Sequence, residues 1–141
     1  MSARWFPDDM PRPAASRETL PWWEAAAAHR LVVQRCRACV HPRHPPGPIC
    51  PACHDVGFDW VESSGRGTIY TWTAVHRAFV PSLAAVLPYV VVVVELDDPP
   101  GVRMVSNLVE ADPTAVRVGQ RVRVVWEDVA PGLALPRFVL A

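Results

Sequence analysis

Apolar and polar residues alternate along much of the second half of the chain, with the two-residue period of half-buried β-strands. Thr68–Val75 is rich in β-branched and aromatic residues, and its alternation places Ile69 and Thr71 on one face and Tyr70 and Trp72 on the other. Tyr89–Leu96 is almost continuously apolar, which predicts a buried strand. Further strands are predicted at residues 31–35, 58–62, 102–109, 121–127 and 136–140.

The five strands from residue 68 onward, with no long helix between them, predict a small antiparallel barrel. Ser63–Gly67 is a glycine-rich turn without the spacing or the following helix of a phosphate loop, so we expect a bulge or tight bend at a barrel corner. Asp97–Gly101 predicts a hairpin, residues 111–118 one helical turn or irregular chain, and residues 128–135 a loop. The strand order fits an OB-fold, and periodicity alone also allows an SH3-like barrel.

The N-terminal segment has a different pattern. Residues 1–18 contain three prolines among polar residues, which predicts a mobile arm, and Trp5 and Phe6 would anchor it either on its own domain or on a partner subunit. A short helix is predicted from Thr19, a residue able to cap it, to about His29-Arg30. Its Trp22 and Trp23 lie about 100° apart. Either both tryptophans pack in the core, or one packs inward while the other faces a neighbour or ligand.

All four cysteines form two C-x-x-C pairs, Cys36/Cys39 and Cys50/Cys53, separated by ten residues. Two such pairs around a short turn are typical of a zinc ribbon, in which four thiolates close a tetrahedral shell at about 2.3 Å. A closed shell indicates a structural Zn²⁺. The same ligands bind iron in rubredoxin-like sites, the less favoured alternative, and two disulfides are a minor one. The nearby His41, His44 and His54 are interpreted as bystanders, because four cysteines already saturate the metal.

The composition of the chain limits the classes of partner that it is expected to bind. Fourteen arginines balance fourteen acids and there is no lysine, and this neutrality disfavours a general nucleic-acid binder. Residues 1–58 carry seven arginines against five acids, and residues 59–141 seven against nine. The first residues contain no apolar signal segment, and the longest apolar run is too short to span a membrane. A cytoplasmic location is therefore expected.

From about Pro21 to Phe138 the chain resembles the zinc-ribbon/OB-fold acyl-CoA-associated proteins. The resemblance depends on the order of several short motifs, which are Pro21-Trp-Trp23, Gln34-Arg-Cys36 after Leu31, the two C-x-x-C pairs, Gly65–Thr73, Pro88-Tyr-Val90, Glu95-Leu-Asp97, Ser106-Asn-Leu108, Val118-Gly119 and Pro136-Arg-Phe138. It implies a mainly β protein with an N-terminal arm and helix (residues 1–30), a rubredoxin-like zinc ribbon (31–58) and a five-stranded OB-fold barrel (59–141).

The resemblance also implies a function. Family members serve as accessory subunits that complete the acyl-CoA site of a thiolase-fold enzyme, such as a steroid side-chain aldolase or an acyltransferase, or that pair with a MaoC-type enoyl-CoA hydratase. An α2β2 assembly with a thiolase-fold partner is the implied stoichiometry. This chain departs from the family at Val40 and His54, where members usually have glycine after each C-x-x-C pair. A positive φ there is tolerable for histidine and costly for β-branched valine.

The sequence carries no evident catalytic constellation, because it has no spare cysteine and no lysine. The chain is therefore not expected to be catalytic alone. Exposed apolar residues in the segment 76–88 predict either a partner or acyl-chain contact or a lid over the barrel core. Single-stranded nucleic-acid binding through Tyr70 and Trp72 is the remaining alternative. The candidate contact residues for a partner or acyl-CoA are Trp22, Trp23, His76, Phe79 and Leu83.

Overall fold

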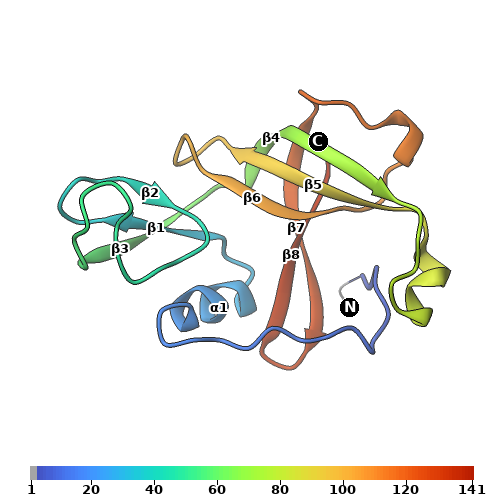
Figure 1. Ribbon diagram of the computed structural model, residues 1–141, viewed down its shortest axis with the longest axis horizontal. Helices are drawn as coiled ribbons and strands as arrows, with labels where there is room; N and C mark the ends of the chain where they lie inside the picture. The colour runs from blue at the N-terminus through green and yellow to red at the C-terminus, as the bar shows by residue number, and fades with distance from the viewer. Residues whose placement is uncertain (1–2) are drawn as a thin grey trace.

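The computed structural model describes residues 3–141 (Figure 1). One α-helix precedes a small three-stranded sheet, and a larger barrel follows. The elements are α1 (Leu20–Ala27), β1 (Val32–Cys36), β2 (Pro42–Arg43), β3 (Phe58–Glu62), β4 (Arg66–Val75), the 3-10 helix η1 (Pro81–Val86), β5 (Tyr89–Leu96), β6 (Arg103–Leu108), the 3-10 helix η2 (Pro113–Ala115), β7 (Arg121–Ala130) and β8 (Leu133–Leu140).

The ribbon is an antiparallel sheet in the order β2-β1-β3. Gln34 on its central strand is fully buried, and its Oε1 accepts hydrogen bonds from Arg43 Nε at 2.7 Å and from the Gly47 backbone N–H at 2.8 Å. The Arg43 guanidinium lies over the Phe58 ring, 5.8 Å from its centroid. These contacts hold the turn between the two cysteine pairs against the sheet.

The barrel closes in the order β4-β5-β6-β8-β7, as expected for an OB-fold. β6 and β8 are parallel and pair at a single position, Leu108 with Phe138, near the C-terminal ends of both strands. No further residues of the two strands are paired in the ladder. The backbone N–H of Val109 donates to the Phe138 carbonyl at 2.8 Å, and the Ser106 hydroxyl donates to the Pro136 carbonyl at 2.6 Å. The outer face of the barrel is therefore least continuous between β6 and β8.

The core of the barrel is formed by side chains that point inward from every strand. Phe138 and Val92 are fully buried at its centre. Gly67 is required by close packing, because a Cβ at this position would lie 2.4 Å from the Glu95 carbonyl oxygen. Along β5 buried and half-buried residues alternate, so this strand is not buried on both faces as its valine run predicted.

The glycine-rich turn before β4 is a tight bend, with Gly65 at a φ of 74°, which is one of the two conformations expected for it from the sequence. A β-bulge lies further along the chain, in β4 between Ile69 and Thr71. It reverses the alternation, so Trp72 packs against the core while Tyr70 is 48% exposed, and the two rings do not form one stacking face. Residues 128–135 were predicted as a loop, but β7 and β8 continue through them and meet at a tight turn.

Helix α1 lies beside the barrel and packs Trp22 and Ala26 inward, one turn apart on the same face (Figure 1). Thr19 occupies the N-cap position but its side chain makes no capping bond, because its hydroxyl instead accepts from the Ser16 backbone N–H at 2.8 Å. After the helix, the His29 ring stacks on Trp126 at 5.6 Å, and this contact ties the helix end to β7.

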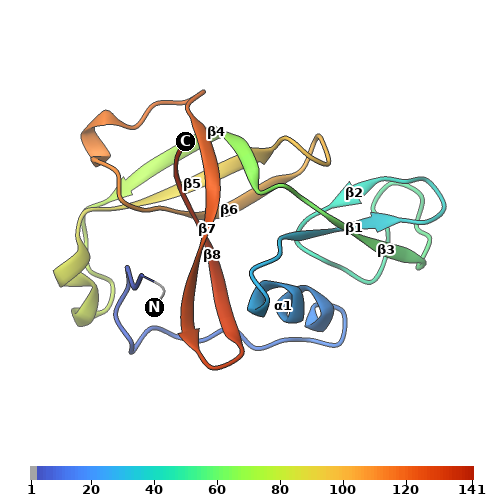
Figure 2. The same cartoon turned by 180° about the vertical axis from the view of Figure 1, so that it is seen from behind.

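The arm runs along the barrel of its own chain, the first of the two alternatives for Trp5 and Phe6. The backbone N–H groups of both residues donate to the buried Glu127 carboxylate, and the Phe6 ring meets Tyr89 edge-to-face at 5.7 Å. Within residues 3–141 no helix has the length and apolar character needed to cross a bilayer. Figures 1 and 2 show the ribbon and the η1 segment at opposite ends of the molecule.

Candidate metal centre and adjoining groove

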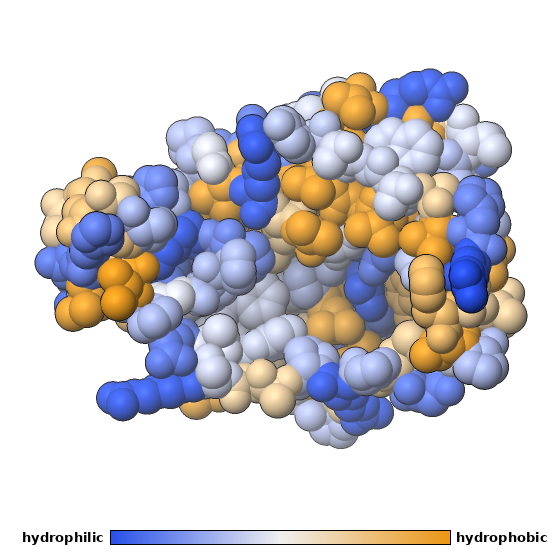
Figure 3. Space-filling model, in the orientation of Figure 1, coloured by the Kyte–Doolittle hydropathy of each residue, from blue (hydrophilic) through white to orange (hydrophobic). Residues whose placement is uncertain are grey.

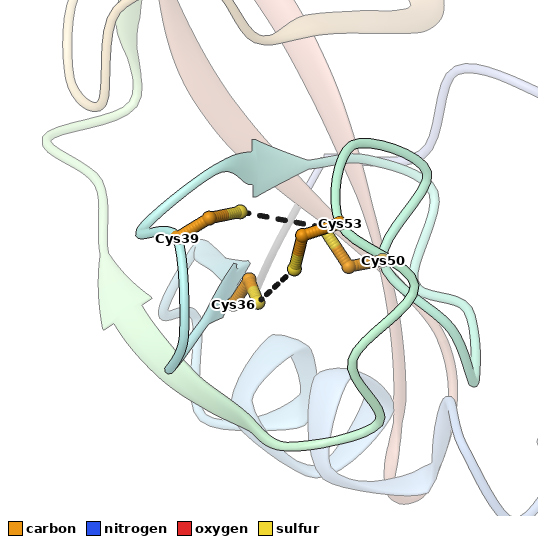
Figure 4. Close-up of side chains that lie close together, drawn as sticks. All are labelled: Cys36, Cys39, Cys50 and Cys53. Carbon is orange, nitrogen blue, oxygen red and sulfur yellow. Dashed lines mark hydrogen bonds between the residues drawn. The ribbon is translucent and has the colours of Figure 1, made fainter.

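The four cysteine sulfurs converge at the tip of the ribbon (Figure 4). All four lie within 4.8 Å of one another, with Cys36 Sγ 3.6 Å from Cys53 Sγ and Cys39 Sγ 3.6 Å from Cys50 Sγ. A disulfide would need about 2.05 Å, so the thiols are free. Four sulfurs around one Zn²⁺ at about 2.3 Å lie about 3.8 Å apart, so this donor set fits a tetrahedral metal ion.

Each cysteine pair sits on a knuckle with the same local geometry. The N–H of the residue that follows the second cysteine bonds back to the carbonyl of the first, from Val40 to Cys36 at 3.0 Å and from His54 to Cys50 at 2.9 Å. Both following residues are left-handed, with φ of 58° at Val40 and 65° at His54. The knuckle geometry is thus retained without glycine, at a cost of roughly 1–2 kcal/mol for the valine backbone.

Backbone N–H groups surround one sulfur of the second knuckle. The N–H of Cys53 and that of Ala52 donate to the Cys50 sulfur and, with the neighbouring thiols, lower the Cys50 pKa to about 6 despite its desolvation. The same crowding of thiols raises the pKa of Cys39 and of Cys53, so the thiols do not all ionise easily together, and a bound cation would supply the charge that stabilises four thiolates.

None of the three nearby histidines joins the sulfur cluster, which among residues 3–141 is the sole group of potential metal ligands. His41 and His54 are exposed. The His44 ring packs against Trp22 at 5.7 Å, and burial lowers the His44 pKa to about 4. His44 is therefore a neutral packing residue near pH 7.

A groove of about 460 Å³ lies between the outer face of the barrel, α1 and the ribbon turn. Trp22 and Trp23 form one wall and meet edge-to-face at 4.7 Å, Trp22 buried and Trp23 half-buried. The opposite wall comes from β5, β6 and β8, and Figure 3 shows apolar side chains over β5 and β6 on this side of the molecule. The barrel residues that line it are Val91, Met104, Val105, Ser106, Asn107, Leu135, Pro136 and Arg137.

A network of polar side chains that includes Asn107 and Arg137 forms part of the groove lining. Arg137 donates from Nη2 to Glu127 Oε1 at 2.9 Å and from Nη1 to Asn107 Oδ1 at 2.8 Å, and the Phe6 ring lies 4.7 Å from its guanidinium carbon. Asn107 in turn donates to the Val90 carbonyl at 3.0 Å. Sequence reasoning missed this network, although an arginine and a glutamate within apolar strands were a usable signal.

The structure separates the remaining candidates from the groove. His76, Phe79 and Leu83 line no part of it, and their segment lies at the far end of the barrel (Figure 1). Phe79 is 72% exposed and Val80 is 39% exposed, whereas Leu83, within η1, is buried. Leu83 therefore faces the protein's own interior, and Phe79 is the most exposed large apolar residue of this segment.

Comparison with known proteins agrees with this architecture. Two family models match, "ChsH2, rubredoxin-like zinc ribbon domain" over residues 23–58 and "ChsH2, C-terminal OB-fold domain" over residues 60–127. A solved chain titled "Ltp2-ChsH2(DUF35) aldolase" is 43% identical, with a TM-score of 0.81 over 92% of this chain and 98% of that one. The chain belongs to the ChsH2/DUF35 family. The predicted zinc ribbon and OB-fold are confirmed.

Two curated relatives in this family are longer than this chain. The "Probable enoyl-CoA hydratase alpha subunit" of Thermomonospora curvata is 44% identical over 91% of this chain and 39% of its own length. The "3-oxo-4,17-pregnadiene-20-carboxyl-CoA hydratase alpha subunit" of Mycobacterium tuberculosis is 40% identical over 86% and 38%. The chain therefore spans less than half the length of either relative.

Proposed function

We propose that this ChsH2/DUF35 chain is a non-catalytic accessory subunit of an acyl-CoA enzyme, and that its partner is a thiolase-fold aldolase or acyltransferase. The observation that carries the proposal is the similarity of this chain to a chain from a structure titled as an aldolase, and the match covers 98% of that other chain. The four thiols form one cluster suited to a metal, which leaves no free cysteine nucleophile. An α2β2 assembly is the proposed stoichiometry.

Zinc is the proposed metal, in a structural role. Four thiolates leave no open position for substrate or water, so the ion would brace the ribbon. The match to a rubredoxin-like zinc ribbon domain supports zinc over iron.

Two surfaces are proposed to contact the partner and its acyl-CoA. The groove with Trp22 and Trp23 offers apolar walls next to the ribbon, suited to an acyl chain that the partner presents. Phe79, with Arg77 5.8 Å from its ring, offers an exposed aromatic anchor at the other end, beside the exposed His76. Leu83 is the buried residue of η1 and holds this segment against the protein.

A MaoC-type enoyl-CoA hydratase is the second candidate partner. The observation that favours it is that the two longer relatives, 44% and 40% identical, are named hydratase alpha subunits. Both candidates handle acyl-CoA and differ in the fold of the catalytic partner.

Parallel co-purification distinguishes these proposals. The chain is co-expressed with the thiolase-fold enzyme encoded nearest to it and, separately, with the nearest MaoC-type enzyme, and each mixture is resolved by size exclusion with light scattering. A stable hetero-oligomer with the thiolase-fold enzyme supports the first proposal. A complex with the hydratase alone selects the second, and the absence of both complexes contradicts the accessory role.

A further inference from the structure

Arg43 is a buried arginine whose charge no carboxylate neutralises. The residue is 8% exposed, and within residues 3–141 its guanidinium forms no ion pair. Its Nε donates to Gln34 Oε1 at 2.7 Å and its Nη2 to the Gly47 carbonyl at 2.9 Å, and both acceptors are neutral. A guanidinium stays protonated in proteins, and a buried charge is unfavourable unless it is paired. The surroundings of Arg43 therefore lack a counter-charge.

Two neighbouring N–H donors at this position also lack an acceptor. Arg43 Nη1 and Gln34 Nε2 are buried and have no hydrogen-bond partner in the described chain. They belong to the same hydrogen-bonded pair of side chains. Unsatisfied buried donors of this kind are explained by a bound water or ion. Water would satisfy an N–H group but leave the Arg43 charge unpaired, whereas an anion accounts for both observations.

Arg43 lines a pocket of about 320 Å³ between the ribbon and the start of β6. Figures 1 and 2 show the turn between β5 and β6 directed toward the ribbon. We call this cavity the junction pocket, and its lining residues are His41, Pro42, Arg43, His44, Pro51, Gly101, Val102 and Arg103. No carboxylate is among these described residues, so nothing in the lining repels an anion.

Arg103 is the second cation of the junction pocket. Its Nε pairs with Glu95 at 3.1 Å, and its two Nη groups form no hydrogen bond with a described residue. The side chain is about half exposed, at 51%, and its guanidinium carbon lies 3.6 Å from the centre of the Tyr70 ring. Arg103 thus retains free donors and is held in place on the barrel side.

From the unpaired Arg43, its unsatisfied N–H group and the acid-free pocket that it lines, we infer that the junction pocket binds a phosphate group. A phosphate monoester carries up to two negative charges and three strong acceptor oxygens, and guanidinium groups are its preferred partners. Two arginines match it better than they match a carboxylate, which has one charge and two oxygens. Because Arg43 belongs to the ribbon and Arg103 to the barrel, the bound group would also join the two modules.

Two sources supply this chemistry. One is free inorganic phosphate, which needs no assumption about the function of the chain. The other is the nucleotide end of CoA, and this source rests on the proposed function. The junction pocket adjoins the groove proposed for the acyl chain, since His44 lines both and β6 continues from Arg103 in one to Ser106 and Asn107 in the other.

The test titrates the full chain, with its metal and in phosphate-free buffer, with inorganic phosphate, CoA and 3′-dephospho-CoA by calorimetry. We expect saturable binding at one site per chain and a higher unfolding temperature in the presence of the bound anion. Arg103→Gln is expected to weaken binding about tenfold. Arg123→Gln is the matched control, because Arg123 is exposed on β7 and does not line the pocket, and it should change binding less than about twofold.

Each outcome decides the inference. Equal binding of inorganic phosphate and CoA supports the site with free phosphate as its source, and tighter binding of CoA that is lost with its 3′-phosphate supports the site with CoA as its source. No saturable binding of any of the three compounds overturns the inference. So does binding that Arg103→Gln weakens no more than Arg123→Gln.

Arg43→Met removes the buried charge and is expected to abolish binding. If this variant does not fold or loses its metal, Arg103→Gln decides the question alone. Failure of this site is distinct from failure of the proposed function. A chain that binds phosphate but neither the thiolase-fold nor the MaoC-type enzyme keeps the site and loses the accessory role, and a chain with the opposite behaviour keeps the accessory role and loses the site.

Discussion

Arg137 and Glu127 form an ion pair beneath the N-terminal arm, with Nη2 and Oε1 2.9 Å apart and the two side chains only 14% and 1% exposed. Removing one partner of such a pair leaves a buried charge uncompensated. Glu127→Ala is therefore expected to lower the free energy of unfolding by roughly 3–5 kcal/mol, as measured by urea denaturation.

Glu95→Ala is the matched control, because Glu95 pairs with Arg103 at 3.1 Å on the exposed surface. Its expected loss is below about 1 kcal/mol. Equal losses for the two variants would contradict the structural role assigned to the Glu127–Arg137 pair.

The N-terminal arm supplies backbone hydrogen-bond donors to the buried Glu127 carboxylate. Deleting residues 1–8 removes the Trp5 and Phe6 N–H donors and the Phe6 ring contact with Tyr89. We expect the deletion to lower the free energy of unfolding by about 1–3 kcal/mol, measured by denaturation at constant pH. Deleting residues 1–3 retains these groups and is expected to be close to neutral. An eight-residue deletion as stable as wild type would show that the arm is dispensable.

The cysteine cluster predicts one zinc ion per chain. Cys39→Ser removes one of the four thiolates, so bound zinc is expected to fall well below one equivalent and the ribbon to lose its order, because metal binding and folding are coupled in such modules. Elemental analysis and amide NMR dispersion of the ribbon measure both effects. His41→Ala is the control and should keep its zinc. A coloured, redox-active protein would instead indicate iron.

His44 predicts a pH dependence of stability. Its pKa is lowered to about 4 by burial, below the ordinary value of 6.5, so the unfolded chain takes up a proton before the folded chain does. Stability from this group is complete above pH 6.5 and is lost as the pH falls toward 4, by at most about 3 kcal/mol.

Replacing His44 with glutamine isolates this effect. His44→Gln should flatten the stability profile between pH 6.5 and 4, while His41→Gln on the exposed surface should leave it unchanged. Unfolding measured at half-unit steps tests this directly, and identical slopes for wild type and His44→Gln would refute it.

Much of the fold could be predicted from the sequence because its signals were local. The C-x-x-C spacing determined the cysteine cluster, and two-residue alternation located the barrel strands. The bulge between Ile69 and Thr71 could not be predicted, because it arises from pairing with β5 rather than from a local motif. The same holds for the continuous β7–β8 hairpin, which is fixed by cross-strand pairing.

The surroundings of the site were less predictable. Trp22 and Trp23 were candidates, but their joint wall depends on how α1 lies against β8 and the ribbon turn. The Glu127–Arg137 pair joins two strands across their turn and is completed by arm residues more than 100 positions away. Leu83 looked exposed because the 3-10 turn that buries it has no strong periodic pattern.

The most direct measurement is acyl-CoA cleavage by the thiolase-fold enzyme, assayed alone and after reconstitution with purified wild-type chain. We expect little activity from the enzyme alone, recovery on addition of the chain with saturation at one chain per enzyme subunit, and no activity from the chain by itself. An enzyme that is fully active alone, and unaffected by the chain, would contradict the accessory role.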